Sequence, residues 1–297
     1  MKKNGKEVSY SEQDSLTYAS ANIAFENKQY DNALLGFKNY LSKFPSGRYA
    51  VDANYYAAEI LNSKKDYAAA LAYYSNVAAK APNNFAEPSI LQAARINYFE
   101  KKEYTEAEKY FAQLKSIATT PENRLESMRG LLRCQYKLAD WSNATTNAQD
   151  LLQQKGIATD DKMMANMVIA KNYQNSNQLN EAMAAYKTVI GLGKSEYSAE
   201  ARYRVAEILL AQSKYAEAEK AGFDVINKAG SYDYWITKAY ILLGDVYFRQ
   251  ADYFNAEATL KSVVDNTGIT ELKQEAQQKL DIVIAEKNKN SKVASQQ

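Results

Sequence analysis

Seven alanines recur along this chain at nearly constant spacing, and this repetition restricts the fold more than any other feature. Successive alanines are 37, 37, 37, 38, 36 and 38 residues apart, and a bulky residue lies three positions before each. Around the first alanine, Tyr30, Ala33, Phe37 and Tyr40 follow one another at intervals of three and four, which places them on one face of a helix. The repeated positions are Ala33, Ala70, Ala107, Ala144, Ala182, Ala218 and Ala256. Each alanine is therefore predicted to let a neighbouring helix approach closely.

Each repeat is long enough for two helices and a short turn. In the first repeat, helices are predicted over residues 11–27 and 30–43, and the turn between them allows only an antiparallel hairpin. Breakers such as Pro45–Ser46–Gly47 and Gly230–Ser231 mark the boundaries between repeats. The predicted repeats cover residues 11–46, 47–83, 84–120, 121–157, 158–195, 196–231 and 232–268. Because stacked repeats form one continuous body, we expect a single all-α solenoid of seven hairpins over residues 11–287.

The stretch after the seventh hairpin, residues 269–287, has the pattern of one more amphipathic helix. Leu272, Ala276, Leu280 and Ile284 lie on one side of it. The last repeat of an array otherwise leaves its apolar face in water, so we expect this helix to act as a cap. The polar stretches 1–10 and 288–297 are predicted to be a disordered head and tail.

Composition argues against several classes of function. The chain has 37 Lys and Arg against 35 Asp and Glu, a net charge of +2, so no basic field favours nucleic acid. It has no histidine, which is the commonest general base and metal ligand. Cys134, its one cysteine, lies in a helical apolar pattern and is expected to be buried. We therefore predict a protein that is not an enzyme and uses no cofactor or metal.

No signal peptide or membrane span is expected from the sequence. Met1, Lys2 and Lys3 would suit the start of a signal peptide, but the polar residues 4–7 follow where an apolar run is required. No run approaches the roughly 18 apolar residues of a membrane span. We therefore expect no direct insertion into a membrane.

Two short motifs suggest chemistry but have simpler explanations. Gly193–Lys194–Ser195 ends like a phosphate-binding loop, yet Thr188 replaces the required earlier glycine and a repeat helix replaces the leading strand. We expect an inter-repeat turn there. Asp160 and Asp161 form a carboxylate pair where a helix is predicted to begin, so capping and the helix dipole explain them better than acid–base catalysis.

The repeat pattern resembles the tetratricopeptide repeat, whose unit of about 34 residues has small and aromatic residues at fixed positions and a closing proline. The seventh repeat is most similar, with Tyr240, Leu243, Gly244, Tyr247, Tyr253, Ala256, Leu260 and Val263 in the expected places. The resemblance covers residues 11–287 and implies a right-handed α-solenoid that binds proteins. The third and fourth repeats carry Arg95 and Leu132 where a small residue is usual, so their packing is expected to be looser or locally shifted.

A narrower resemblance concerns the cell compartment. The longer period and the segment from Tyr40 to Tyr49, followed by Asp52–Ala53, look like a bacterial envelope subgroup. That subgroup includes the Tol-Pal-associated periplasmic repeat protein and the repeat lipoprotein of the Bam machine. It implies a periplasmic location if this chain is a fragment or mature form, and a cytoplasmic one otherwise. The lipoprotein signal and its cysteine are missing from the sequence.

In the tetratricopeptide family, the first helices line a concave groove, and ligands contact fixed positions on them. Carried over by register, the partner-binding residues predicted here are Tyr18, Asn22, Tyr55, Glu59, Arg129, Arg133, Tyr136, Lys137, Lys171, Tyr203 and Glu207. Some family members clamp a carboxyl terminus with lysine and asparagine at such positions. Tyr18 and Tyr56 occupy two of them here, so that clamp is not reproduced.

The predicted groove is basic in the middle and acidic at its ends. Arg129, Arg133, Lys137 and Lys171 supply the positive charge, which would suit an extended acidic peptide. A simpler alternative is that Arg129 pairs with an acid on its own helix, a contact worth only a few tenths of a kcal/mol. We predict an adaptor that binds a peptide or protein segment; the alternative is a structural spacer, or a scaffold that self-associates through its convex face or ends.

Overall fold

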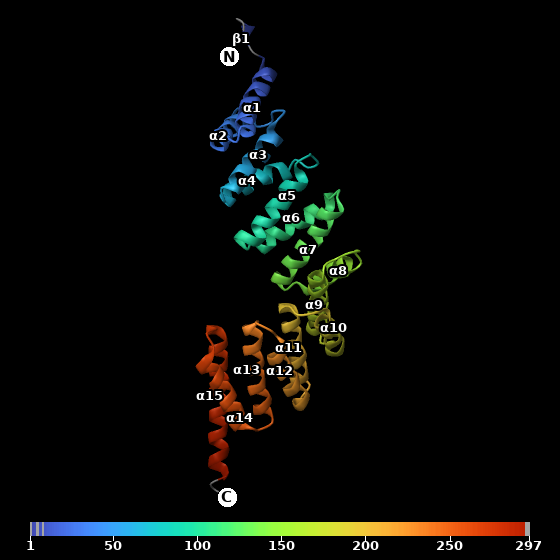
Figure 1. The fold of residues 1–297 in the computed structure, drawn as a ribbon, viewed down its shortest axis with the longest axis vertical. Helices are drawn as coiled ribbons and strands as arrows, with labels where there is room; N and C mark the ends of the chain where they lie inside the picture. Colours follow the sequence, from blue (N-terminus) through green and yellow to red (C-terminus); the bar gives the residue numbers. More distant parts are fainter. Residues whose placement is uncertain (1, 4–5, 8, 295–297) are drawn as a thin grey trace. The chain divides into compact units, whose positions relative to one another are not determined.

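A computed structural model describes residues 2–3, 6–7 and 9–294 of the chain. Residues 1, 4–5, 8 and 295–297, which belong to the predicted head and tail, lie outside the described residues. Strands β1 (Lys2–Lys3) and β2 (Lys6–Glu7) pair antiparallel over two residues each. From residue 9 onward, the described chain is helical with short connections (Figure 1). The prediction of an all-α solenoid of helical hairpins is confirmed.

The chain forms two compact units, residues 1–140 and 141–297. The first unit contains α1 (Tyr10–Glu26), α2 (Tyr30–Lys43), α3 (Ala50–Ser63), α4 (Tyr67–Ala78), α5 (Ala86–Arg95), η1 (Ile96–Lys101), α6 (Tyr104–Ile117) and α7 (Pro121–Leu138). The second contains α8 (Trp141–Leu152), α9 (Thr159–Asn175), α10 (Leu179–Leu192), α11 (Glu196–Ala211), α12 (Tyr215–Lys228), α13 (Asp233–Arg249), α14 (Tyr253–Asn266) and α15 (Thr270–Ala294). Within each unit, every helix packs on the next in sequence, and the predicted fourth repeat has α7 in the first unit and α8 in the second.

The turn inside each of the seven hairpins has the same conformation. One non-glycine residue in each turn has a left-handed backbone, with φ between 56° and 62°. In six of these turns the amide of the following residue bonds a carbonyl five residues earlier, as from Gln29 to Ala24 at 2.9 Å. In the third turn, which follows η1, Glu103 bonds the Asn97 carbonyl six residues earlier. The left-handed residues are Lys28, Lys65, Lys102, Ala139, Asn177, Ser213 and Ala251. Their spacing equals that of the repeated alanines, so the repeat is as regular in its turns as in its core.

The repeated alanines are the centre of the packing. All seven are fully buried. In the first hairpin, Ala33 lies in a core with Phe37 and Tyr40, and this core also takes in Ala53 and Ala57 of the next hairpin. Alanine leaves room for neighbouring backbones, and the ring one turn later fills the remaining volume. The prediction that these alanines make the helix contacts is confirmed.

A π-helical segment explains why the third repeat departs from the pattern. η1 follows α5 directly, and π-helical bonding inserts one residue into the helical register. Ala94 is therefore fully buried against Ala107 and Phe111, while Arg95 lies beside it, half-buried, and reaches Glu126. The predicted local shift is confirmed at this repeat.

The last helix, α15, covers the apolar side of α14. Leu272, Ala276, Leu280 and Val283 are buried against it. Ile284, predicted on the same face, is instead 37% exposed. α15 continues to Ala294, beyond the predicted boundary at residue 287.

None of the helices in the described ranges is both long enough and apolar enough to cross a bilayer.

Candidate protein-binding surface

Aromatic side chains gather where the first helices of the first two hairpins meet. The Tyr18 ring of α1 stacks on Tyr49, which precedes α3, with centroids 4.4 Å apart and an interplanar angle of 7°. Tyr55 of α3 stacks in the same way on Phe85, with centroids 4.4 Å apart, and Tyr56 contacts both of these rings. We call Tyr18, Tyr49, Tyr55, Tyr56 and Phe85 the aromatic cluster. It brings together Tyr18 and Tyr55, two of the predicted partner-binding residues.

A buried polar network fixes the position of Tyr49. The Tyr40 hydroxyl donates to Asp14 at 2.5 Å and accepts from the Tyr49 amide at 2.9 Å. The second oxygen of Asp14 accepts from the Arg48 amide at 2.9 Å. Gly47 makes this loop possible, because a Cβ there would lie 2.4 Å from the Tyr40 hydroxyl. The loop that carries Tyr49 is therefore held by bonds to both helices of the first hairpin.

Asp52 lies in the first turn of α3, next to the aromatic cluster. It is half-buried, and no ion pair joins it to another residue in the described part of the chain. Burial raises the pKa of the Asp52 carboxyl. Burial, followed by the Asp52 charge, also raises the pKa of both Tyr18 and Tyr56. Tyr56 lies one helical turn after Asp52 on α3.

Two other predicted residues occupy the same helices. Glu59 accepts a hydrogen bond from the Tyr74 hydroxyl at 2.5 Å, so it is anchored within the second hairpin. Asn22 is half-buried on α1, one turn after Tyr18.

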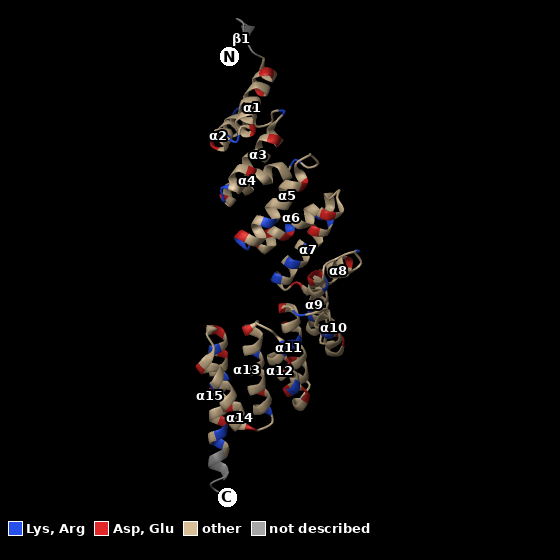
Figure 2. Ribbon diagram, viewed as in Figure 1, with Lys and Arg blue, Asp and Glu red and all other residues tan. Residues whose placement is uncertain are grey.

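Basic residues gather on α7, at the other end of the series of first helices in this unit (Figure 2). Arg129 and Arg133 are half-buried and Lys137 is exposed, while Tyr136 is half-buried between them in sequence. Glu126, three residues before Arg129 on α7, forms an ion pair with Arg95 of α5 at 3.1 Å. We call Tyr18, Asn22, Tyr55, Glu59, Arg129, Arg133, Tyr136 and Lys137 the first-helix surface of the first unit.

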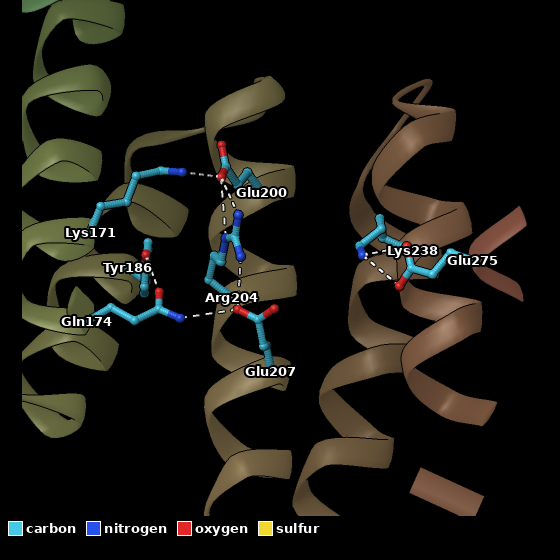
Figure 3. Close-up of polar contacts among 8 residues, drawn as sticks. All are labelled: Lys171, Gln174, Tyr186, Glu200, Arg204, Glu207, Lys238 and Glu275. Carbon is cyan, nitrogen blue, oxygen red and sulfur yellow. Dashed lines mark hydrogen bonds and ion pairs between the residues drawn. The ribbon is translucent and has the colours of Figure 1, made fainter. Parts of the chain in front are cut away.

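In the second unit the predicted residues belong to an ion-pair network (Figure 3). Lys171 of α9 pairs with Glu200 of α11 at 2.6 Å, and Arg204 bonds Glu200 at 3.3 Å and Glu207 at 2.9 Å. Gln174 of α9 donates to Glu207 at 3.1 Å. The two cations and two carboxylates neutralise one another, so this face carries much less charge than the sequence suggests.

Aromatic rings pack against this network, and several of its charged groups are buried or partly buried. Lys171 lies 5.1 Å from the Trp141 ring centroid, and Arg204 lies 5.8 Å from that of Trp235. Burial lowers the pKa of Lys171, and the Glu200 charge opposes that shift. Tyr203 is only 6% exposed and packs on Trp235. Lys171 and Tyr203 therefore act mainly within the fold in this structure.

The motifs that suggested chemistry have structural roles. Lys194 lies between Gly193, which ends α10, and Ser195, which accepts from the Ser198 amide and begins α11. The expected inter-repeat turn is confirmed. Asp160 and Asp161 lie in the first turn of α9, although the residue before that helix is Ala158 and provides no side-chain cap.

Reactive or metal-binding groups do not gather among the described residues. Cys134 is buried as predicted, and burial, followed by the charge of Glu108, raises its thiol pKa to about 12. The described ranges contain no group of three or more acids, cysteines or histidines placed to hold a metal ion.

The sequence model of the tetratricopeptide repeat family matches residues 18–85 and 167–234, one segment in each unit. These two segments are similar in sequence to tetratricopeptide repeats. A search of curated proteins finds no match, and the likeness to solved structures lies in the fold.

Three solved structures are similar in fold to this chain. The C-terminal part of a repeat-containing protein from Cytophaga hutchinsonii is 15% identical, with a TM-score of 0.54 over 87% of this chain and 98% of that one. Yeast Tom70 is 16% identical, with a TM-score of 0.50 over 95% of this chain and 62% of that one. A tetratricopeptide repeat protein from Parabacteroides merdae is 14% identical, with a TM-score of 0.47 over 91% and 98%.

The tetratricopeptide register alone did not identify Tyr49, Asp52 and Phe85, which lie beside this surface. Tyr49 and Phe85 lie in connections between hairpins, outside the first helices. Asp52 and Tyr56 lie on α3, three and seven residues after Tyr49. That spacing could have placed the three on one stripe. The partner of Lys171 could not be found in this way, because Glu200 is 29 residues away in the sequence.

Proposed function

We propose that the chain is a non-catalytic scaffold that binds a segment of another protein along the first-helix surface of its first unit. One observation carries this proposal: Asp52, beside that surface, has no ion-pair partner in the described chain, whereas the charges of the second unit's network neutralise one another. Tyrosine is enriched among the residues that carry binding energy at protein interfaces, and an unpaired charge beside such rings can select a partner of opposite charge.

The charges along this surface favour an extended ligand with a defined direction. Asp52 and Glu59 make the α3 region acidic, and Arg129 and Arg133 make the α7 region basic. Arginine forks bind carboxylates in a bidentate manner, so the ligand would place acidic side chains near α7. The sequence predicts an acidic, extended peptide. The acidic side chains of such a peptide would therefore contact only the α7 end of the surface.

Selection from a library of displayed random peptides on the immobilised full chain would test this proposal. Selected peptides are then titrated against the wild type, the Arg129→Glu/Arg133→Glu variant and a control variant, Lys80→Glu/Lys109→Glu. The control makes the same change of charge outside the first helices. We expect the first variant to weaken binding at least tenfold and the control less than twofold. Selection of no peptide, or equal effects of both variants, would contradict the proposal.

A second candidate function is self-association, and exposed apolar residues of the first hairpin favour it. Leu16, Ile23 and Leu35 are 46%, 61% and 70% exposed on α1 and α2. Exposed apolar side chains can mark contacts between proteins when they form one patch, and Leu16 and Ile23 lie two turns apart on one face of α1. In this case the molar mass measured by light scattering would rise with concentration, and Leu35→Lys would abolish the rise. A constant monomer mass would exclude this function.

We also place the resulting complex in the bacterial cell envelope, because of the resemblance of the segment from Tyr40 to Tyr49. Hydrogen bonds among Asp14, Tyr40 and Tyr49 hold this same segment in place. Fractionation of cells that produce the native protein, followed by detection with an antibody, tests this location. Recovery with cytoplasmic markers would contradict it.

A further inference from the structure

We propose that the aromatic cluster, with Asp52 as counter-ion, is a pocket for one cationic side chain of the bound segment, a lysine or an arginine. This inference deepens the proposed function and rests on it. It assigns a positive group to the part of the ligand that lies near α3, opposite in sign to the acids expected near α7.

The arrangement of α3 places the carboxylate among aromatic rings. Tyr49 directly precedes α3, and Asp52 and Tyr56 lie one turn apart on α3, so these two side chains share one face of the helix. Tyr18 approaches from α1, stacked on Tyr49. Tyr18 and Tyr56 both pack on Phe37. The Asp52 carboxylate thus lies one helical turn from a ring of this packed group. The faces of such rings carry negative potential and attract cations, and the aliphatic stem of lysine or arginine can pack against them.

The charges around Asp52 favour a cation from outside the chain. In the described part of the chain, its carboxylate forms no ion pair. Arg48, the nearest basic residue in sequence, has its guanidinium carbon 5.6 Å from the centroid of the Tyr49 ring. Glu26 and Glu59 add negative charge next to Tyr56 and Tyr55, respectively. An acidic ligand group would be repelled here, and a neutral one would leave the half-buried carboxylate unpaired.

The pocket is held in shape before any ligand binds. Tyr49 is positioned by its amide bond to the Tyr40 hydroxyl, and that hydroxyl is fixed by Asp14. Tyr56 packs on Phe25 of α1, with ring centroids 4.7 Å apart, and on Phe37 of α2, with centroids 5.8 Å apart. Preformed rings lose little conformational freedom on binding, which favours recognition of a single side chain. The same rings are partly exposed, so a side chain can reach them.

The test uses small probes that differ only in charge. The tripeptide Ac-Gly-Lys-Gly-NH2 and its norleucine counterpart are titrated into the isotope-labelled full chain, and the NMR signals of the tyrosine rings are followed. We expect the lysine peptide to shift the signals of Tyr18, Tyr49 and Tyr56 in a saturable manner. The norleucine peptide, which has the same aliphatic stem and no charge, is expected to bind at least tenfold more weakly.

Two variants locate the charge that matters. Asp52→Asn is expected to reduce lysine-peptide affinity at least fivefold, to near the norleucine value. Asp31→Asn, on α2 of the preceding hairpin, serves as the control and is expected to change affinity less than twofold. Tyr18→Leu provides a second variant that removes a ring but keeps apolar volume, and it should weaken binding of the lysine peptide. Equal binding of both peptides, no shift at these tyrosines, or equal effects of the two aspartate variants would overturn the proposal.

Failure of this pocket and failure of the proposed function give different results. If library selection yields peptides whose binding needs Arg129 and Arg133 but no lysine or arginine in the ligand, the pocket is wrong and the scaffold function stands. If the lysine tripeptide binds at the cluster but no library peptide is selected, the pocket stands and the peptide-binding function is wrong.

Discussion

The two units build similar helical hairpins but use charged residues differently. In the first unit, Asp52 lies among tyrosine rings without an ion-pair partner in the described chain, and the buried acid Asp14 bonds hydroxyl and amide groups. In the second unit, Glu200 accepts from both Lys171 and Arg204. The first unit thus keeps charge available beside an aromatic surface, while the second uses charge to join its own helices.

This difference shows that position in a repeat does not determine the role of a residue. Tyr18 and Tyr203 occupy equivalent positions in the repeat, but Tyr18 is half-buried at the surface and Tyr203 is buried under Trp235. The role depends on the neighbours that each hairpin supplies. The following experiments test the comparison, from the largest expected effect to the smallest.

Glu200→Gln should destabilise the second unit most. The Glu200 side chain is 8% exposed, and its loss removes one carboxylate from both Lys171 and Arg204. We expect the free energy of unfolding to fall by about 3 kcal/mol, because the ion pairs of two partly buried cations with this carboxylate are lost. Both tryptophans, Trp141 and Trp235, lie in the second unit, so denaturant unfolding followed by tryptophan fluorescence measures this effect.

The exposed ion pair of Glu286 with Lys289 on α15, in the same unit, provides the control for Glu200. Glu286→Gln should lower the free energy of unfolding by less than about 0.5 kcal/mol, since solvent screens this pair. If Glu200→Gln has an equally small effect, the network does not stabilise the second unit and the comparison fails.

Tyr40→Phe should destabilise the first unit by about 2 kcal/mol. The change removes the hydroxyl that donates to buried Asp14 and accepts from the Tyr49 amide, so both groups lose a partner. Far-UV circular dichroism during urea unfolding would detect the shift. The tryptophan fluorescence transition should stay in place if the first unit unfolds separately. A matching shift in fluorescence would show that the two units unfold together.

Glycine substitutions in the hairpin turns should change the free energy of unfolding by the same amount in both units. Ala139 in the first unit and Ala251 in the second have left-handed backbones, which glycine adopts without steric cost. Each alanine-to-glycine change is expected to raise the free energy of unfolding by about 0.5–1 kcal/mol. Ala221→Gly, inside α12, should instead lower it by about 1 kcal/mol. Destabilisation by the turn variants would contradict the left-handed assignment.

Asp52→Asn should stabilise the first unit slightly at neutral pH. Burial raises the pKa of Asp52 in the folded chain, so the folded state binds a proton more readily than the unfolded state. Its contribution to stability therefore falls as pH rises from the ordinary pKa of aspartate through the raised pKa. The gain from asparagine is expected to be below about 1 kcal/mol because the group is half-exposed, and to vanish in acid. A gain that is unchanged in acid would contradict this cause.

Much of the fold could be predicted because the repeat pattern is local. The alanine spacing identified the packing positions, and the short connections identified the hairpins. The shift at Arg95 was predicted, but the π-helical segment that causes it was not, since an extra residue in a turn leaves no distinct sequence pattern. The same local reasoning placed Tyr18 and Tyr55 correctly on first helices, but it gave no account of what each would contact.

By itself, the sequence determined the periodic features of this protein: the helices, the buried alanines and the turns, because each depends on residues within one repeat. The tertiary structure decided which charges remain available. Lys171 became part of a buried pair because α11 brings Glu200 to it, whereas no helix of the described chain brings a cation within ion-pair distance of Asp52. Electrostatic interactions act through space between residues far apart in sequence, so they follow the packing of helices rather than the repeat register.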